Sequence, residues 1–214
     1  MALCLYRYET LNSINLIKSF GLLFTILILL TTCSNVERKQ GIYGEIDSNK
    51  ITEAFAFCKK QKMDTTICFM VAMSIHSGKN RFFVWDFKNK KVLYSGLCCH
   101  GMGGGSTQAT PVFSNVSGSY CTSLGKYKTG IRSYSQWGIH VHYKLHGLES
   151  TNSNAFARVV VLHSYDPVPT FQIYPAHLPM GWSLGCPVID NDLMTVLDGM
   201  LKNRKSPVLL WIYQ

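Results

Sequence analysis

The sequence predicts a mainly β domain with short flanking helices. Short apolar runs recur from residue 66 onward and are separated by turn-forming residues. Apolar residues recur at helical spacing only before the first of these runs and shortly before the last. Strands therefore do not alternate with helices as they do in a parallel α/β fold. The chain of 214 residues is long enough for one such domain with a substantial core, plus an N-terminal extension.

The N-terminal extension has the features of an export signal. Lys18 precedes an apolar run over residues 20–30, which is short of the ~20 residues that a membrane-spanning helix needs. The run ends in Leu30-Thr31-Thr32-Cys33, which looks like a bacterial lipobox, so that Cys33 would become the acylated first residue of the mature protein. Ordinary cleavage and an uncleaved anchor are the alternatives. We therefore expect a signal peptide over 1–33, a polar tether over 34–47 and the folded domain over 48–214, in an exported lipoprotein anchored at a membrane and facing the periplasm.

Local signals place the elements of the folded domain. Ser48 is suited to cap a helix over 49–62, whose apolar residues fall on one face. Strands are expected over 66–75, and over 81–87 and 91–97 on either side of Lys88-Asn89-Lys90, which suits a hairpin loop. Asp190 or Asn191 is suited to cap a last helix that runs to Lys202. The remaining strands are expected over 138–145, 157–163 and 207–213.

Composition narrows the range of partners. The net charge of +9 either favours anionic partners, which for an exported protein means cell-wall polymers or lipid head groups, or forms a basic surface that only keeps the protein soluble. The sequence has no pattern for nucleic-acid binding, zinc ligation or a phosphate loop, so nucleic acid, metal and nucleotide cofactors are not expected. Among the eight cysteines, Cys98 and Cys99 are adjacent, and in a strand at most one of them would pack inward. Buried free thiols are the expected state of the cysteines that have no catalytic role.

Cys186 is the candidate nucleophile. It follows Ser183-Leu184-Gly185, and a glycine at this point allows a sharp turn that brings backbone N–H groups close to a bound carbonyl. His163 ends an apolar strand upstream and is suited to take the thiol proton, while Ser164 beside it is suited to orient the ring. We expect the N–H groups of Gly185 and Cys186 to bind an oxyanion and Ser183 to support the turn. In papain-like peptidases the cysteine precedes the histidine, so the reversed order here points to another class.

Five sequence blocks, in this order, resemble the L,D-transpeptidase (YkuD-like) catalytic domain, specifically its murein L,D-transpeptidase branch. The blocks are SNVSGS (114–119), SLGKYKTG (123–130), LHGLE (145–149) with NSNA (152–155), RVVVLHS (158–164) and SLGCP (183–187). A weaker likeness over 73–78 extends the resemblance to about two-thirds of the chain. The chain departs from the common family pattern at Leu184, where histidine is often found, and at Pro187, where Ile or Val is usual. The spacer between His163 and Cys186 is also longer than usual.

The resemblance implies a β-sandwich or barrel and a peptidoglycan L,D-transpeptidase. Cys186 would attack the carbonyl before the D-Ala at position four of a tetrapeptide stem. The acyl group would then pass to an amine, giving a 3→3 cross-link, or to water, with no metal or organic cofactor. A non-catalytic peptidoglycan-binding lipoprotein is the alternative from another class. A sortase-like transpeptidase is the enzymatic alternative, but it requires an arginine on a strand soon after the cysteine, and Arg204 lies near a helix end.

Residues near these blocks are candidates for binding the stem peptide. Arg158 is placed either to clamp a substrate carboxylate or to brace the loop before the histidine strand, where Asn154 also lies. His146 either touches substrate or sits in a turn. Tyr134, like Trp137, either lines a peptide groove or packs in the core. We interpret His140 and His142, two residues apart on one side of a strand, as structural, because no third metal ligand is apparent.

Overall fold

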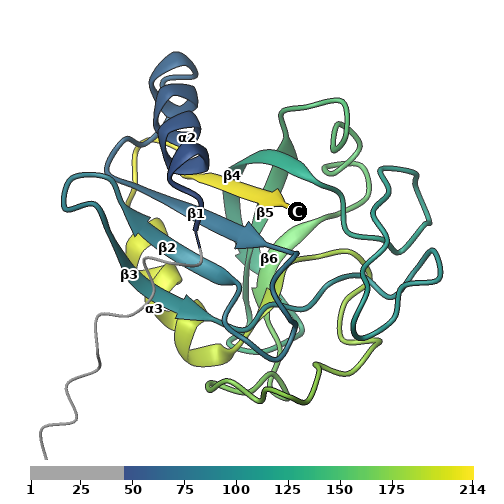
Figure 1. Cartoon of the computed structure of the whole chain (residues 1–214). Coiled ribbons are helices and arrows are strands. Elements are labelled where there is room, and N and C mark those ends of the chain that lie inside the picture. Colours follow the sequence, from purple (N-terminus) through teal and green to yellow (C-terminus); the bar gives the residue numbers. More distant parts are fainter. Residues whose placement is uncertain (1–45) are drawn as a thin grey trace, which may run out of the picture. The chain divides into compact units, whose positions relative to one another are not determined.

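The computed structural model describes residues 46–214 (Figure 1), and the predicted signal peptide, Cys33 and residues 34–45 of the tether lie outside this range. Its two helices are α2 (Ser48–Lys60) and α3 (Asn191–Leu201). No helix within the described range has the length and apolarity to cross a membrane. The strands are β1 (Ile67–Ala72), β2 (Phe82–Asp86), β3 (Lys91–Gly96), β4 (Gly125–Tyr134), β5 (Val141–Gly147), β6 (Val161–Ser164), β7 (Val188–Ile189) and β8 (Leu209–Tyr213).

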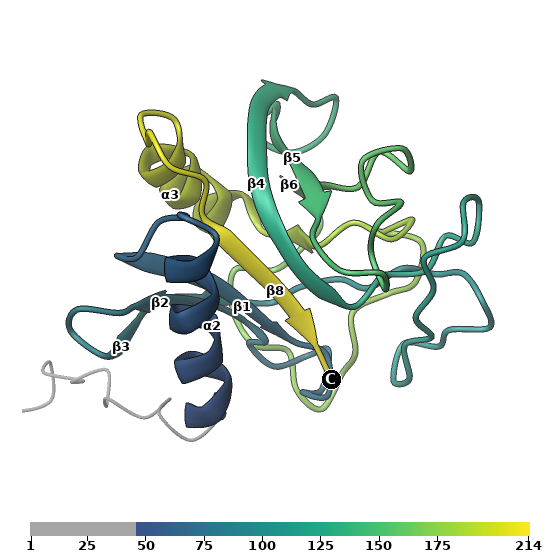
Figure 2. The same ribbon diagram turned by 90° about the horizontal axis from the view of Figure 1, so that it is seen from above.

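All eight strands belong to one sheet in the order β3-β2-β1-β8-β4-β5-β6-β7. The pairs β1–β8 and β6–β7 are parallel, and the other neighbouring pairs are antiparallel. The sheet curls strongly through β4, which forms a long arc in Figure 2. A bridge between Cys99 and Val188 joins the segment after β3 to β7, so the two edges of the sheet approach each other and the sheet is nearly closed. The predicted mainly β class with short flanking helices is therefore confirmed.

The two helices cover opposite faces of the sheet around β1 and β8 (Figure 1). Alternation along β1 sends Phe69 and Val71 into the core that contains α3, whereas Cys68 and Met70 face the cluster that contains α2. Every residue of β1 and β8 is buried because both faces are covered. The inner faces of β4, β5 and β6 complete the core on the α3 side.

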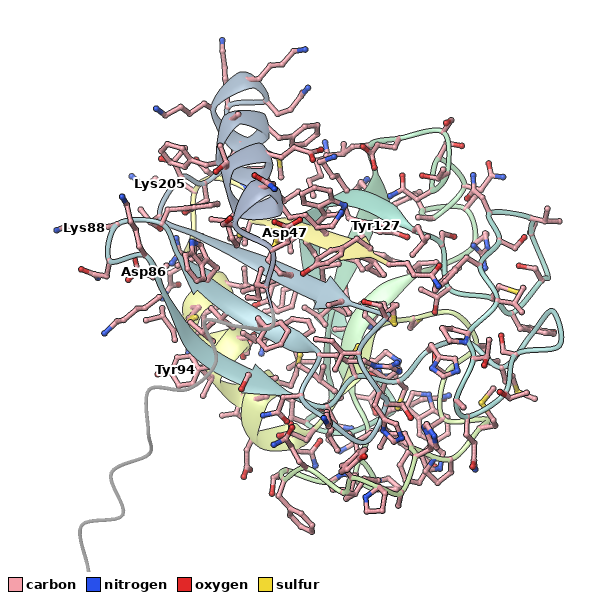
Figure 3. The ribbon with its side chains drawn as sticks, viewed as in Figure 1. Asp47, Asp86, Lys88, Tyr94, Tyr127 and Lys205 are labelled. Atoms are coloured by element: carbon pink, nitrogen blue, oxygen red, sulfur yellow. The ribbon has the colours of Figure 1, made fainter. Side chains whose placement is uncertain are left out.

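The first helix begins one residue earlier than expected. Asp47 is the N-cap, and its carboxylate accepts a hydrogen bond of 2.8 Å from the Asn49 N–H (Figure 3). Ser48 is the first helical residue, so the prediction of Ser48 as the cap was wrong. At the other end of the domain, Asp190 caps α3 as predicted, by accepting from the Leu193 N–H.

Three other expectations need correction. The strand expected over 138–145 begins only at Val141, because His140 has a left-handed backbone with φ +60°. The strand expected over 157–163 begins only at Val161, because Val159 has φ +58° in a turn. Cys98 and Cys99 do point to opposite faces, but both are buried because each face has its own core. Cys58, Cys68, Cys98, Cys99 and Cys121 are buried free thiols, as expected.

Candidate active site

An open cleft of about 770 Å³ lies where the end of β4, the start of β5 and strand β6 meet. The sequence-predicted residues that line it are Cys186, His163, Ser183, Arg158 and Tyr134. Among the described residues, the rest of its wall has no Asp, Glu, Lys or Arg and includes the aromatic residues Tyr120, Trp137, Tyr165 and Trp182. The structure thus brings the proposed thiol and imidazole, which are 23 positions apart in the sequence, to one concave surface.

Strand pairing explains why Cys186 and His163 share this surface. His163 pairs with Val188 in the parallel β6–β7 ladder, and Cys186 lies two residues before Val188. Cys186 itself lies in a bend outside β7, where its Sγ rests against the Val161 N–H of β6. Cys186 and His163 are thereby held along the same strand and both line the cleft.

The Cys186 sulfur sits against the backbone of β6. Its Sγ accepts a hydrogen bond of 3.4 Å from the Val161 N–H and lies 3.9 Å from the Val159 carbonyl oxygen. Burial raises the pKa of the Cys186 thiol, while the Val161 N–H and the cationic side chains of Arg158 and Lys144 oppose that rise. Because burial dominates, Cys186 rests as a neutral thiol.

Ser183 shapes the turn that carries Cys186. Its hydroxyl donates to the Cys186 carbonyl oxygen at 2.6 Å and accepts from the Gly185 N–H at 3.0 Å. Gly185 has φ +114°, and a Cβ at this position would lie 2.6 Å from the Cys121 carbonyl oxygen, so only glycine fits. The Gly185 N–H, which we expected to bind an oxyanion, is therefore engaged within the turn. The Cys186 N–H has no hydrogen-bond partner within residues 46–214 and remains the candidate oxyanion donor.

His163 is held in one tautomer by the backbone of Ser164. Its Nδ1 lies 3.0 Å from the Ser164 carbonyl oxygen. A carbonyl can only accept, so Nδ1 carries the proton and Nε2 is the basic nitrogen of the neutral ring. Burial lowers the pKa of His163, which keeps the ring neutral at pH 7. No hydrogen bond joins the His163 ring to the Cys186 sulfur among the described contacts.

Ser164 acts on His163 through its main chain. Its side chain is fully buried, and the hydroxyl oxygen accepts a hydrogen bond of 3.1 Å from the Ile139 N–H. This bond ties the turn before β5 to the end of β6. It therefore holds the carbonyl that orients the imidazole.

Arg158 braces the loop that leads to the cleft. Its guanidinium donates to the carbonyl oxygens of Ser114 and Cys121, at 2.9 and 2.6 Å, and to the hydroxyls of Ser119 and Ser123. Of the two roles considered for Arg158, the geometry fits bracing better than binding of a substrate carboxylate. Its charge still acts on the Cys186 thiol.

Of the other residues predicted to bind the stem peptide, one lines the cleft and two lie outside its lining. Tyr134 is 74% exposed at the cleft wall and stacks on His140. Asn154 does not line the cleft; its backbone N–H and side-chain amide bond to Asn115. His146 also lies outside the lining and stacks on Phe156.

Sequence reasoning missed His142 as a cleft residue. His140 and His142 were paired as structural, but only His142 lines the cleft. It is the direct neighbour of His163 on the adjacent strand, since the two residues pair in the β5–β6 register. The local sequence carries no signal for this, because the position depends on how two distant segments align. No group of three possible metal ligands occurs among residues 46–214.

The fold and the cleft define a mainly β domain that presents a cysteine and a tautomer-fixed histidine on one face of a curled sheet. The family model of the L,D-transpeptidase catalytic domain matches residues 43–213, and the chain belongs to this family. The resemblance noted in the sequence blocks is thereby confirmed.

No curated protein matches the chain. Among solved structures, it is similar to the helical cell shape determining protein Pgp2 from Campylobacter jejuni, with 11% identity and a TM-score of 0.45 over 70% of this chain and 48% of that chain. It is also similar to an L,D-transpeptidase from Xylanimonas cellulosilytica, with 10% identity and a TM-score of 0.36 over 74% of this chain and 68% of that chain. The chain spans about half the length of the Pgp2 structure.

Proposed function

We propose that the protein is a peptidoglycan L,D-transpeptidase in which Cys186 is the nucleophile and His163 is its general base. Membership of the L,D-transpeptidase catalytic domain family supports the reaction class. The observation that carries the residue assignment is the hydrogen bond from His163 Nδ1 to the Ser164 carbonyl, which leaves Nε2 basic in the cleft that Cys186 lines.

The proposed reaction has two halves. In the first, His163 Nε2 takes the thiol proton and the sulfur attacks the carbonyl between the third residue and the D-Ala at position four. The Cys186 N–H stabilises the oxyanion, and His163 returns the proton to the departing D-Ala amine, so that a thioester remains. In the second half an amine of a neighbouring stem replaces the sulfur and gives a 3→3 cross-link. Water in place of the amine gives an L,D-carboxypeptidase.

We also propose that this chemistry takes place in the cell envelope, at a membrane surface. The proposal is based on the apolar run over 20–30 and the lipobox-like Leu30-Thr31-Thr32-Cys33. Acyl chains on Cys33 would anchor the domain by burying CH₂ groups, at ~0.8 kcal/mol each. The anionic polymers and lipids of that compartment match the net positive charge of the chain.

The decisive experiment is to incubate the purified full-length protein with defined tetrapeptide muropeptides and to identify the products by mass spectrometry. The wild type should release D-Ala and form cross-linked or trimmed products. Cys186→Ala should abolish both while the circular dichroism spectrum and the melting temperature stay close to those of the wild type. Release of D-Ala by a well-folded Cys186→Ala protein would rule out the nucleophile assignment.

A strained β-lactam of the carbapenem type tests the same site covalently. Its electrophilic carbonyl should acylate Cys186 and add the full mass of the drug. Burial raises the pKa of Cys58 and Cys98 to about 12 and that of Cys68 well above its ordinary range, and none of these thiols lines the cleft. Peptide mapping should therefore place the adduct on Cys186 and not on Cys58, Cys68 or Cys98.

A further inference from the structure

His142 stands beside His163 in the cleft. The two residues are directly paired across the antiparallel β5 and β6 strands. Directly opposed side chains in such a pair lie on the same face, with Cβ atoms roughly 4.5–5.5 Å apart. Both side chains line the cleft that Cys186 also lines. The cleft therefore holds two imidazoles, of which the reaction as described so far uses one.

The His142 ring has an unused nitrogen. Its Nε2 is buried and has no hydrogen-bond partner among the described residues. The Tyr134 backbone interacts with the ring and favours its protonated form. The unpartnered Nε2 is the ring nitrogen left for a ligand. A buried polar atom without a partner destabilises the protein, so a ligand that bonds to Nε2 recovers that loss.

The other histidines of this region do not share this property. His140 has its Nδ1 3.2 Å from the Ser135 carbonyl oxygen and stacks on Tyr134. His146 stacks on Phe156 and lies outside the cleft lining. His163 has Nδ1 committed to Ser164 and its free Nε2 assigned to the thiol. His142 is thus the imidazole of the cleft whose basic nitrogen has no assigned task.

Burial and the charges around the cleft keep the His142 imidazole neutral and able to act as a base. No Asp or Glu is among its described lining residues, so the histidines are the side chains there that can accept a proton near pH 7. Burial and the nearby Lys144 ammonium lower the pKa of His142, and the Tyr134 backbone opposes that shift. The other charged or titratable residues that line the cleft are His163, Cys186, Arg158, Tyr120, Tyr134 and Tyr165. His142 is therefore unprotonated at pH 7 and able to accept a proton.

The second half of the reaction needs such a base. A side-chain amine has a pKa of about 10.4 and arrives almost entirely as the ammonium ion, which cannot attack a thioester. We propose that His142 forms the acyl-acceptor site of this cleft, where its Nε2 receives the incoming primary amine and removes the proton that blocks attack. This inference rests on the proposed transpeptidase function and adds a residue for the acceptor.

The proton balance of the step is as follows. The ammonium gives one proton to His142 Nε2, and the neutral amine forms a C–N bond to the thioester carbonyl carbon. Collapse of the tetrahedral intermediate breaks the C–S bond. The second amine proton passes through His163 to the Cys186 sulfur, so that the products are the amide, the free thiol and a protonated His142. Release of that proton to solvent restores the resting state.

The test separates the two halves of the reaction in the full-length protein. His142→Gln retains an amide of similar reach but no base, and His140→Gln is the matched control two residues away and outside the cleft lining. D-Ala release from a tetrapeptide muropeptide in a single turnover reports the first half. The ratio of amide product to hydrolysed product, with an added amine, reports the second half. Two amines are compared, an alkyl amine with a pKa of about 10.4 and glycinamide, an α-amine with a pKa of about 8.

If the proposal is right, His142→Gln keeps single-turnover D-Ala release within about twofold of the wild type. Its transfer to the alkyl amine falls about 10²-fold or more, which is the range of general-base catalysis. Transfer to glycinamide falls at least tenfold less, because a larger fraction of that amine is already neutral. A purely structural role would not depend on the pKa of the amine. The control His140→Gln should match the wild type in both halves.

Two results would overturn the role of His142. One is an unchanged product ratio with both amines, and the other is an equal loss with both amines. His142→Asn serves as a second variant if His142→Gln unfolds, and the same comparison of amines applies to it. Failure of the wild type to release D-Ala at all would instead refute the proposed function, so the two failures are distinguishable.

Discussion

The pH dependence of Cys186 acylation follows from the charge states of the resting site. Burial raises the pKa of the Cys186 thiol above its ordinary value and lowers the pKa of His163 below its own. From ordinary values of about 8.5 and about 6.5, no more than about 3% of the thiol is ionised at pH 7, and more than about 75% of the imidazole is neutral. The resting pair is therefore thiol and neutral imidazole, so a base must act during the attack.

The perturbation is His163→Gln, and the assay is the rate of carbapenem adduct formation by intact-mass spectrometry between pH 5 and 9. In the wild type the rate should rise through the lowered pKa of His163, at a pH below about 6.5, and then stay level to about pH 8. In His163→Gln the rate should be about 10²–10⁴-fold lower at pH 7. It should then rise about tenfold per pH unit, because the reaction depends on the thiolate fraction alone.

A wild-type rate that climbs tenfold per unit from pH 7 to pH 8.5 would refute this reasoning, since it is the behaviour of a thiol without a base. A His163→Gln variant with the wild-type profile would also refute it. His146→Gln is the matched control, because His146 lies outside the cleft lining and should leave the profile unchanged.

Three further predictions concern the supports of the site and the anchor. Gly185→Ala should lower the free energy of unfolding by about 1–3 kcal/mol or more in chemical denaturation, because the new Cβ meets the Cys121 carbonyl oxygen at φ +114°; wild-type stability would contradict this. Arg158→Lys should cost about 2–4 kcal/mol in the same assay, because one ammonium cannot reach the four acceptors of the guanidinium; a loss below about 0.5 kcal/mol would show that the brace is dispensable. Labelling with a fatty-acid analogue should require Cys33, and a soluble protein with Cys33 unmodified or cleaved away would overturn the lipid anchor.

The elements that the sequence predicts well carry their signal locally. The hairpin of β2 and β3 follows from two apolar runs around Lys88-Asn89-Lys90, and α3 follows from Asp190 before an amphipathic run. Strand β4 was missed because only its first half is buried, and its register with β5 shifts between Thr129 and Arg132. An irregular strand that is polar in its second half has no clear period in the sequence.

In the candidate site, too, the features with a local sequence signal could be predicted and those that depend on distant segments could not. Cys186 and His163 could be proposed because a short motif and the order of the two residues carry information. The contacts of Arg158 and the position of His142 could not, because they depend on the loop over 114–123 and on the register of β5 against β6. The engagement of the Gly185 N–H by the Ser183 hydroxyl is local in sequence, yet it depends on a backbone conformation that a motif does not specify.

The neutral resting pair has a consequence for how the thiol is protected and activated. The thiolate is the form that reacts with oxidants and binds metals, so a partly buried Cys186 with a raised pKa is spared most of this chemistry while the cleft holds no substrate. A substrate carbonyl beside the Cys186 N–H changes the balance, because negative charge then develops where that N–H and the Arg158 and Lys144 cations favour it. In the proposed mechanism, proton transfer to His163 then accompanies the attack. The Ser164 carbonyl contributes by fixing the imidazole tautomer that can accept this proton, while the Ser164 hydroxyl is engaged by the Ile139 N–H.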